Sequence, residues 1–281
     1  MGDLIPVELE SSDLMSVVGV KRLQSYGRQS ISLGPVGLYA YPSGAGELET
    51  AARDLIGQLK SFTTVMFEWN VRFDHGELAK EIQALGVPCR RTVVHALRIH
   101  GDYDRSFAGF NSTTRNLIRR TRREGLVVRR SAQAQDVNAY YDLYERVART
   151  KHRLLYPRSV FEQLLKLEED VLFVVAQGYN KLIGGAWFFR DGDTALYWHS
   201  EMDVQYAKQS PMYAILDCAI RMAHEEGRTF FNFGASSGLP SLEQFKAKWG
   251  AEPQYGWHFN WVNPLWQAVH RCKTGLRAYA G

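Results

Sequence analysis

The sequence of 281 residues lacks any run of about 18 apolar residues, so no segment of it predicts a membrane-spanning helix. Cysteine is scarce: Cys89, Cys218 and Cys272 lie far apart, and no CxxC pair is present. This spacing argues against a zinc ribbon and a disulfide scaffold. The first residues, MGDLIPVELESSDLMS, are acidic and have no apolar core of a secretion signal. We therefore expect a cytoplasmic protein with no metal site and no membrane span.

The composition is that of a globular protein. Apolar residues make up 45% and charged residues 23% of the chain, which excludes global disorder, a collagen helix and a coiled coil. The length suffices for one large domain or two smaller ones with a substantial hydrophobic core. The net charge is only +4, but the positive charge is concentrated in one segment.

Helix and strand patterns alternate through the whole sequence. Residues 47–62 have apolar side chains at spacings of three and four, which predicts an amphipathic helix, and the β-branched and aromatic residues 63–69 predict a strand. Further on, VLFVVAQ, GGAWFFR and TALYWHS, joined by short turns, predict an antiparallel three-stranded meander. A helix over 211–226, the strand RTFFNFG and a helix starting at Pro240 follow. Strands and helices in both halves indicate an α/β or α+β fold in two lobes.

The concentrated positive charge lies in the segment from Arg115 to Arg130, which holds seven arginines and one opposing residue, Glu124. On a helical wheel for 107–124, one third of the circumference carries four of these arginines. They are Arg115, Arg119, Arg122 and Arg123. Like charges one turn apart are mutually destabilising. Such a stripe therefore favours a polyanionic partner such as RNA or a phosphate, although a merely solvated helix face would have the same pattern.

Two polar aromatic side chains lie near the end of the third meander strand. In a regular strand, Tyr197 and His199 project from one face and Trp198 and Ser200 from the other. A tyrosine beside a histidine could form a proton-transfer pair. The alternative is that His199 simply forms a hydrogen bond where the strand ends.

The segment Gly234–Gly238, GASSG, matches the G-x-S-x-G pattern of hydrolase nucleophiles and lies between a strand and a helix. A hydrolase is nevertheless excluded, because no aspartate follows Ser236 and too few residues remain to build a triad. A glycine-rich turn whose N–H groups contact an anion is the more economical interpretation, and a plain turn is equally compatible. Asn232 and Ser236 are accordingly candidate substrate contacts.

Two lysines follow in FKAKWG, residues 245–250. Lys246 and Lys248 are about 200° apart on a helical wheel, so we do not expect both to face one site. Both are retained as candidates, with the expectation that one of them is ordinary surface.

The ordered series F-x2-F-x4-R-x3-RR-x-RR-x-GL-x-V (107–128), V-x-A-x5-LIGGAWFF (174–189), HEEG, FFNFG and FKAKWG resembles the FemABX-like branch of the GNAT acyltransferase superfamily. The best-known members of that branch transfer amino acids from aminoacyl-tRNA onto peptidoglycan precursors. The resemblance covers residues 105–255 well and the first hundred residues more loosely. Its order and spacing are specific to the branch and not to a substrate.

The resemblance implies two GNAT-like lobes, each a mixed sheet flanked by helices, with a cleft between them. Residues 1–105 would form a degenerate first lobe and 106–261 the catalytic lobe, with 262–281 returning to the first. The implied activity is aminoacyl transfer from tRNA to an amine of a peptide-like precursor in cell-wall or natural-product assembly. Lys246 falls on the lysine of the family's FK pair, on the donor side, and the arginine-rich segment matches the family's own.

One departure from GNAT enzymes in general concerns the donor. Acetyl-CoA binders carry a glycine-rich loop whose N–H groups hold the pyrophosphate, whereas the matching stretch 204–214, VQYAKQSPMYA, has no glycine and contains Pro211. We therefore expect no coenzyme A and aminoacyl-tRNA as co-substrate. Two alternatives remain open: an acyl-CoA-dependent N-acyltransferase that binds coenzyme A in another way, and a non-catalytic RNA- or partner-binding protein.

Overall fold

The structure is a computed structural model. It describes residues 4–10, 16–23, 29–33, 47–61, 63–72, 75–151, 153, 155–178, 181–236 and 239–268. Cys272, the last two residues of the GASSG segment and the expected return of 269–281 to the first lobe lie outside the described residues. The mixed α/β class expected from the sequence is confirmed.

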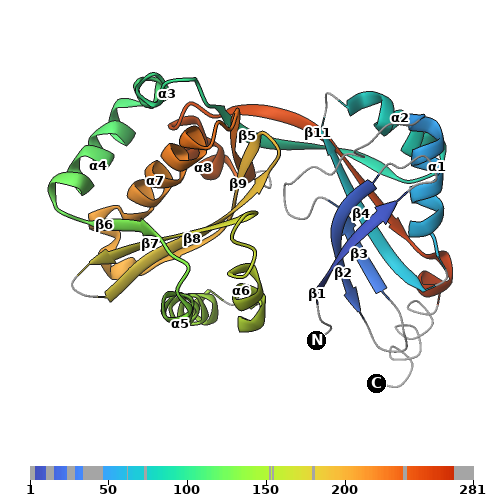
Figure 1. Cartoon of the computed structure of the whole chain (residues 1–281), viewed down its shortest axis with the longest axis horizontal. Coiled ribbons are helices and arrows are strands. Elements are labelled where there is room, and N and C mark those ends of the chain that lie inside the picture. The colour runs from blue at the N-terminus through green and yellow to red at the C-terminus, as the bar shows by residue number, and fades with distance from the viewer. Residues whose placement is uncertain are drawn as a thin grey trace. The chain divides into compact units, whose positions relative to one another are not determined.

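The chain divides into two compact units (Figure 1). One consists of Met1–Val93 and Gln254–Gly281, and the other of Val94–Pro253. The division falls inside two strands, β5 (Cys89–Arg98) and β11 (Glu252–Val262). It differs from the boundary expected at residue 105, because the second half of β5 pairs with a strand of the later unit.

The first unit is a sheet with strand order β1-β2-β3-β4-β11. Its further elements are β1 (Leu4–Glu10), β2 (Ser16–Leu23), β3 (Gln29–Leu33), α1 (Leu48–Leu59), β4 (Thr64–Arg72) and α2 (Gly76–Ala84). Strands β3 and β4 are parallel, whereas β11 runs antiparallel to β4. The apolar face of α1 packs on Phe67, Trp69 and Phe259, which are fully buried.

The second unit has the strand order β5-β10-β9-β8-β7-β6. Its elements in chain order are α3 (Tyr103–Gly109), α4 (Ser112–Arg123), β6 (Val127–Arg130), α5 (Ala134–Thr150), α6 (Arg158–Leu164), β7 (Val171–Gly178), β8 (Lys181–Asp191), β9 (Thr194–Met202), the 3-10 helix η4 (Val204–Gln209), α7 (Pro211–Glu225), β10 (Phe230–Ala235) and α8 (Pro240–Ala247). Strands β7, β8 and β9 form the antiparallel meander that the sequence predicted.

Helices cover both faces of this sheet, α5 and α6 on one and α4 and α7 on the other (Figure 1). Side chains of β7 alternate between the two faces. Leu172 and Val174 pack toward α7, whereas Phe173 and Val175 pack toward α5. Burial on both faces explains why this strand is an unbroken apolar run in the sequence.

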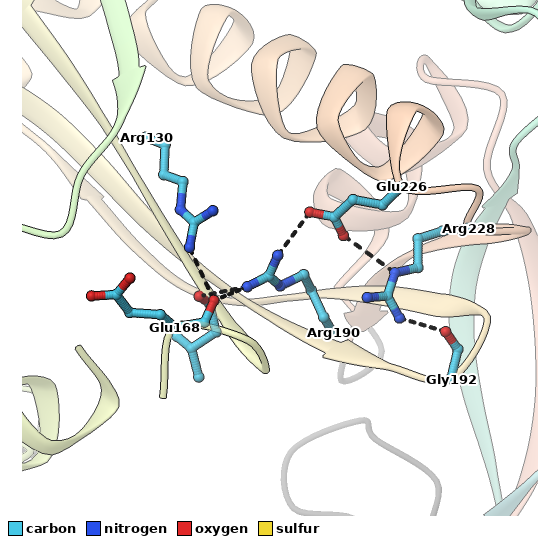
Figure 2. Close-up of polar contacts among 7 residues, drawn as sticks. Arg130, Glu168, Arg190, Gly192, Glu226 and Arg228 are labelled. Carbon is cyan, nitrogen blue, oxygen red and sulfur yellow. Dashed lines mark hydrogen bonds and ion pairs between the residues drawn. The ribbon is translucent and has the colours of Figure 1, made fainter. Parts of the chain in front are cut away.

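Arg190, at the end of β8, connects three segments of the second unit (Figure 2). Its guanidinium lies 2.8 Å from the carboxylate of Glu226 at the end of α7 and donates to the carbonyl oxygen of Glu168. The same carboxylate accepts a hydrogen bond from Arg228, which also donates to the carbonyl oxygen of Gly192. Only 9% of the Arg190 side chain is exposed, so its guanidinium is largely removed from water although its partners Glu226 and Glu168 lie at the surface.

Replacing this arginine tests its structural role. We expect Arg190→Met to lower the free energy of unfolding by about 1–3 kcal/mol, because the hydrogen bonds that join β8 to Glu226 and Glu168 are lost. Arg149→Met is the matched control, since Arg149 is 73% exposed in an i,i+4 pair with Glu145 and its loss costs about 0.5 kcal/mol or less. Urea unfolding of both variants measures the difference, and equal midpoints would contradict the assigned role.

Candidate active site

A β-bulge in β10 is the centre of the candidate site. Asn232 pairs with Ala96 of β5 and Ala235 pairs with Val94, so two residues of β10 lie opposite the single residue between them on β5. Gly234 is one of the two, with φ of +73°, a conformation that side-chain-bearing residues rarely adopt. Its N–H is bonded by the side chain of Asn232, 2.8 Å away. The bulge therefore takes the peptide groups of Gly234 out of the regular ladder.

Lys246, on α8, is the hydrogen-bond donor to the carbonyl group that this bulge exposes. Its Nζ donates to the carbonyl oxygen of Gly234 over 2.7 Å, and the residue is 5% exposed. Burial lowers the pKa of Lys246 to about 8, and the charge of Glu243 one turn earlier opposes that shift. The second lysine of the motif, Lys248, is exposed, as expected from their separation around the helix. Only Lys246 belongs to the site.

Ser236 and His95 form a second polar pair at the bulge. The Oγ of Ser236 is 3.4 Å from Nδ1 of His95, the β5 residue opposite the bulge, and both residues are buried. Burial lowers the pKa of the His95 imidazole, the charge of Lys246 lowers it further, and Glu243 opposes both. Sequence reasoning missed His95. The one available signal was an imidazole within the apolar run VVHALRI.

Tyr197 of β9 reaches the same neighbourhood through its main chain. Strands β9 and β10 pair only at Phe230–Asn232, and a Cβ on Gly234 would lie 3.7 Å from the carbonyl oxygen of Tyr197. The Tyr197 hydroxyl bonds to Ser200. Burial raises the pKa of Tyr197 to about 12, so the phenol keeps its proton at physiological pH. It can donate a hydrogen bond, but it does not act as a base.

The expected pairing of Tyr197 with His199 on one strand face is wrong. A register shift in the β8–β9 ladder inserts Trp198 as an extra residue, because Trp187 pairs with His199 whereas Phe188 pairs with Tyr197. Tyr197 consequently packs toward α7 and His199 toward α5. A bulge reverses the face of every later residue, which a strict period of two cannot anticipate.

His199 is held in an aromatic cluster. Its Nδ1 lies 2.6 Å from the hydroxyl of Tyr140, and its ring centroid is 4.6 Å from that of Tyr144. Burial, followed by the charge of Arg153, lowers the pKa of His199 to about 4, so its imidazole is neutral at physiological pH. These contacts place His199 on the face of the sheet opposite Tyr197.

The arginine-rich segment is also organised differently from the single helix expected over 107–124. The helix is interrupted at Phe110, which ends α3. Asn111 caps α4, because its side-chain oxygen accepts a hydrogen bond from the N–H of Thr114 at 3.0 Å. Arg115 donates hydrogen bonds to the carbonyl oxygens of Phe110 and Ala108, the latter at 2.7 Å. These bonds satisfy carbonyl groups at the C-terminal end of α3 that have no partner within the helix.

The other arginines of the stripe differ in how far the fold engages them. Arg122 forms a 2.7 Å ion pair with buried Asp217 of α7. Arg119 lies over the ring of Phe107, 5.4 Å from its centroid, and is otherwise exposed. Arg123 is exposed and has no hydrogen bond or ion pair within the described part of the chain. Two of the four predicted contacts are thus engaged by the fold and two, Arg119 and Arg123, are accessible.

The segment between β9 and α7 is the stretch that the sequence analysis compared with the glycine-rich loop of acetyl-CoA binders. Several of its N–H groups are bonded internally: Gln205 to the Asp203 carboxylate at 3.1 Å, Tyr206 to the Asp203 carbonyl at 3.0 Å and Ser210 to Ala207 at 3.0 Å. Pro211, the first residue of α7, has no N–H. The residues present therefore do not form the usual pyrophosphate cradle.

A guanidinium also bonds to this segment. Arg120 donates to the hydroxyl of Ser210 at 2.8 Å and to the carbonyl oxygen of Lys208. Ser210 has φ of +55°, the one non-glycine residue with positive φ in the described ranges. The entry to α7 is thus bonded to one side chain of α4, that of Arg120.

Over the residues that the structure describes, no group of three or more histidine, cysteine, aspartate and glutamate side chains could hold a metal ion. None of the helices described is long and apolar enough to cross a bilayer.

Comparison with known proteins relates this arrangement to a family. The model of the acetyltransferase (GNAT) domain matches residues 108–248, just over half of the chain. No curated protein matches the sequence.

Solved structures share the fold at low identity. FemX has a TM-score of 0.70 and 13% identity, covering 95% of this chain and 90% of that one. A domain assigned to a lysylphosphatidylglycerol synthetase from Agrobacterium fabrum has a TM-score of 0.61 and 13% identity, covering 95% and 88%. A tandem GNAT protein from the clavulanic acid biosynthesis pathway reaches 0.52 and 13%, covering 93% and 99%. The chain therefore belongs to the acetyltransferase (GNAT) family, and its fold is similar to that of FemX.

Proposed function

We propose that this acyltransferase moves an aminoacyl group from aminoacyl-tRNA to an amine of a peptide-like precursor, in cell-wall or natural-product assembly. The observation that carries the choice of donor is the segment before α7, where several N–H groups are bonded internally and to which Arg120 is hydrogen-bonded. A donor held by its pyrophosphate needs those groups, whereas an RNA-linked donor does not. The exposed Arg119 and Arg123 supply positive charge for RNA phosphates.

The reaction needs alignment, loss of a proton and charge stabilisation, but no covalent nucleophile, because the aminoacyl ester is already activated. The amine nitrogen bonds to the ester carbonyl carbon, the bond from that carbon to the ribose oxygen breaks, and the amine proton ends on that oxygen. The Lys246 ammonium, fixed by Gly234, stabilises the negative charge that develops on the carbonyl oxygen. The Tyr197 phenol keeps its proton and can donate a hydrogen bond. The Asn232 side chain accepts a hydrogen bond from the N–H of Gly234 and so maintains the bulge.

The first unit is assigned to the acceptor in this proposal. It is taken as the degenerate first lobe, containing the sheet of β1–β4 with β11, while the second unit carries Lys246 and the donor contacts. His199 is given no donor contact, because it packs against Tyr140 on the other face of the sheet.

Because the chain belongs to the acetyltransferase (GNAT) family, a second candidate function is an N-acyltransferase that uses an acyl-CoA as donor. A single assay separates the two. Purified protein is incubated with charged total tRNA and candidate amine acceptors, with and without RNase, and the products are analysed by mass spectrometry. We expect an amide product that disappears after RNase treatment. A product formed only with acyl-CoA, together with a thermal shift from coenzyme A, would replace the tRNA proposal with the second candidate.

The salt dependence of tRNA binding tests the two accessible arginines. Each neutralised phosphate contributes about −0.7 to −0.9 to the slope of log affinity against log salt. We expect Arg119→Gln with Arg123→Gln to flatten this slope by roughly 1–2 units and to raise the donor KM with little change in kcat. Arg53→Gln with Arg149→Gln removes the same charge from exposed positions on α1 and α5 and is the control. An unchanged slope would show that the stripe does not contact RNA.

Removing the buried ammonium tests catalysis against mere binding. We expect Lys246→Met to lower kcat by about 10²–10³-fold, as when one charge-stabilising donor is lost, and to leave tRNA affinity within threefold. Lys248→Met, on the exposed side of the same helix, is the matched control for transfer rate. Circular dichroism verifies folding. Full activity of the folded Lys246→Met protein would contradict the role given to this lysine.

A further inference from the structure

The proposed reaction leaves the first recipient of the amine proton unassigned. Lys246 is held as a hydrogen-bond donor to Gly234, and the Tyr197 phenol retains its own proton. His199 lies on the opposite sheet face. A further protein group that takes this proton needs a free lone pair near physiological pH.

His95 is the residue that the β10 bulge singles out. It is the single residue of β5 between Val94 and Ala96, opposite the extra residue of the bulge. The bulge carries Gly234, the acceptor of Lys246, and ends next to Ser236, the partner of His95. One backbone irregularity thus brings an imidazole, a hydroxyl and an ammonium together, and bulges of this kind recur beside active sites, where they redirect side chains.

We propose that His95 takes the proton that the acceptor amine loses on attacking the donor ester, with Ser236 orienting its ring. When the His95 Nδ1–H donates to Ser236 Oγ, Nε2 keeps its lone pair. The amine nitrogen forms its bond to the carbonyl carbon as its proton passes to Nε2. That proton then moves to the ribose oxygen as the ester bond breaks, so His95 ends neutral. This inference rests on the proposed aminoacyl transfer.

The charges around His95 suit this role. Lys246 and Glu243, both on α8, are the charged groups that face it. Burial and Lys246 lower the pKa of His95 below 6.5, with Glu243 opposing, so the ring is neutral and able to accept a proton at pH 7. Lys246, with a pKa of about 8, is mostly protonated there. The rate should therefore rise as pH increases through the His95 pKa and fall again above about 8.

The test compares His95→Gln with a matched histidine. His258 in β11 has the same 8% exposure and a side-chain bond to Asn70 of 2.8 Å, so His258→Gln removes an equally buried imidazole. We expect His95→Gln to lower kcat by about 10²-fold or more, with donor KM within threefold and the acid limb of the pH profile abolished. His258→Gln should keep kcat within threefold.

A second measurement needs no change at position 95. The His95 pKa is followed by NMR in the wild-type protein and in Lys246→Met, and is compared with the acid limb of wild-type kcat/KM. We expect the kinetic and NMR values to agree within about half a unit, and the NMR value to rise in Lys246→Met. Disagreement in the wild type, or kcat of His95→Gln within threefold, overturns the inference. Failure of the wild-type protein to transfer from charged tRNA overturns the proposed function itself.

Discussion

The hydrogen bond from Lys246 to the carbonyl oxygen of Gly234 is the interaction on which the candidate site depends. It exists because Gly234 has φ of +73°, which turns its peptide groups out of the β10 ladder. A side-chain-bearing residue would be strained in that conformation. Since Asn232, Ser236 and His95 are all arranged around this one bulge, the same glycine determines the geometry of the whole group.

Burial sets the pKa and the orientation of the Lys246 ammonium. An exposed ammonium is a strongly hydrated point charge, whereas the Lys246 ammonium is held against the carbonyl oxygen of Gly234 and has a pKa of about 8. In the proposed reaction, a pre-oriented charge needs no reorganisation as the carbonyl oxygen of the donor becomes negative. Burial, and after it the charge of Lys246, lowers the pKa of the neighbouring His95 imidazole.

The arginine-rich segment shows how the fold divides one charge pattern between structure and function. Arg115 satisfies the carbonyls at the end of α3, Arg120 fixes the entry to α7, and Arg122 neutralises buried Asp217. Arg119 and Arg123 are exposed and form no ion pair among the described residues, so two guanidinium groups of the stripe are not engaged by the fold's carboxylates. The positive charge of the sequence therefore overstates what is available for binding.

Local sequence patterns predicted the helices and strands, whereas the arrangement of the candidate site depends on pairing between strands that are far apart in the sequence. The meander and the mixed α/β class followed from strand composition and short turns, and Asn111 with its cap could have revealed the break between α3 and α4. The proximity of His95 to Ser236, 141 positions along the chain, depends on strand pairing that no local pattern encodes. Likewise, the extra residue Trp198 reverses the face of His199 without any glycine or proline to signal it.

The most direct test of the account is to locate the donor's acyl end by NMR. A short RNA with an amide-linked aminoacyl 3′ end is titrated into the labelled protein while the amide signals of Gly234 and Ser236 and the Lys246 side chain are followed. We predict that these signals shift together, that the apparent affinity falls as salt is raised, and that coenzyme A does not reproduce the shifts. Shifts confined to other residues, or the same shifts produced by coenzyme A alone, would contradict an RNA-linked donor at the β10 bulge.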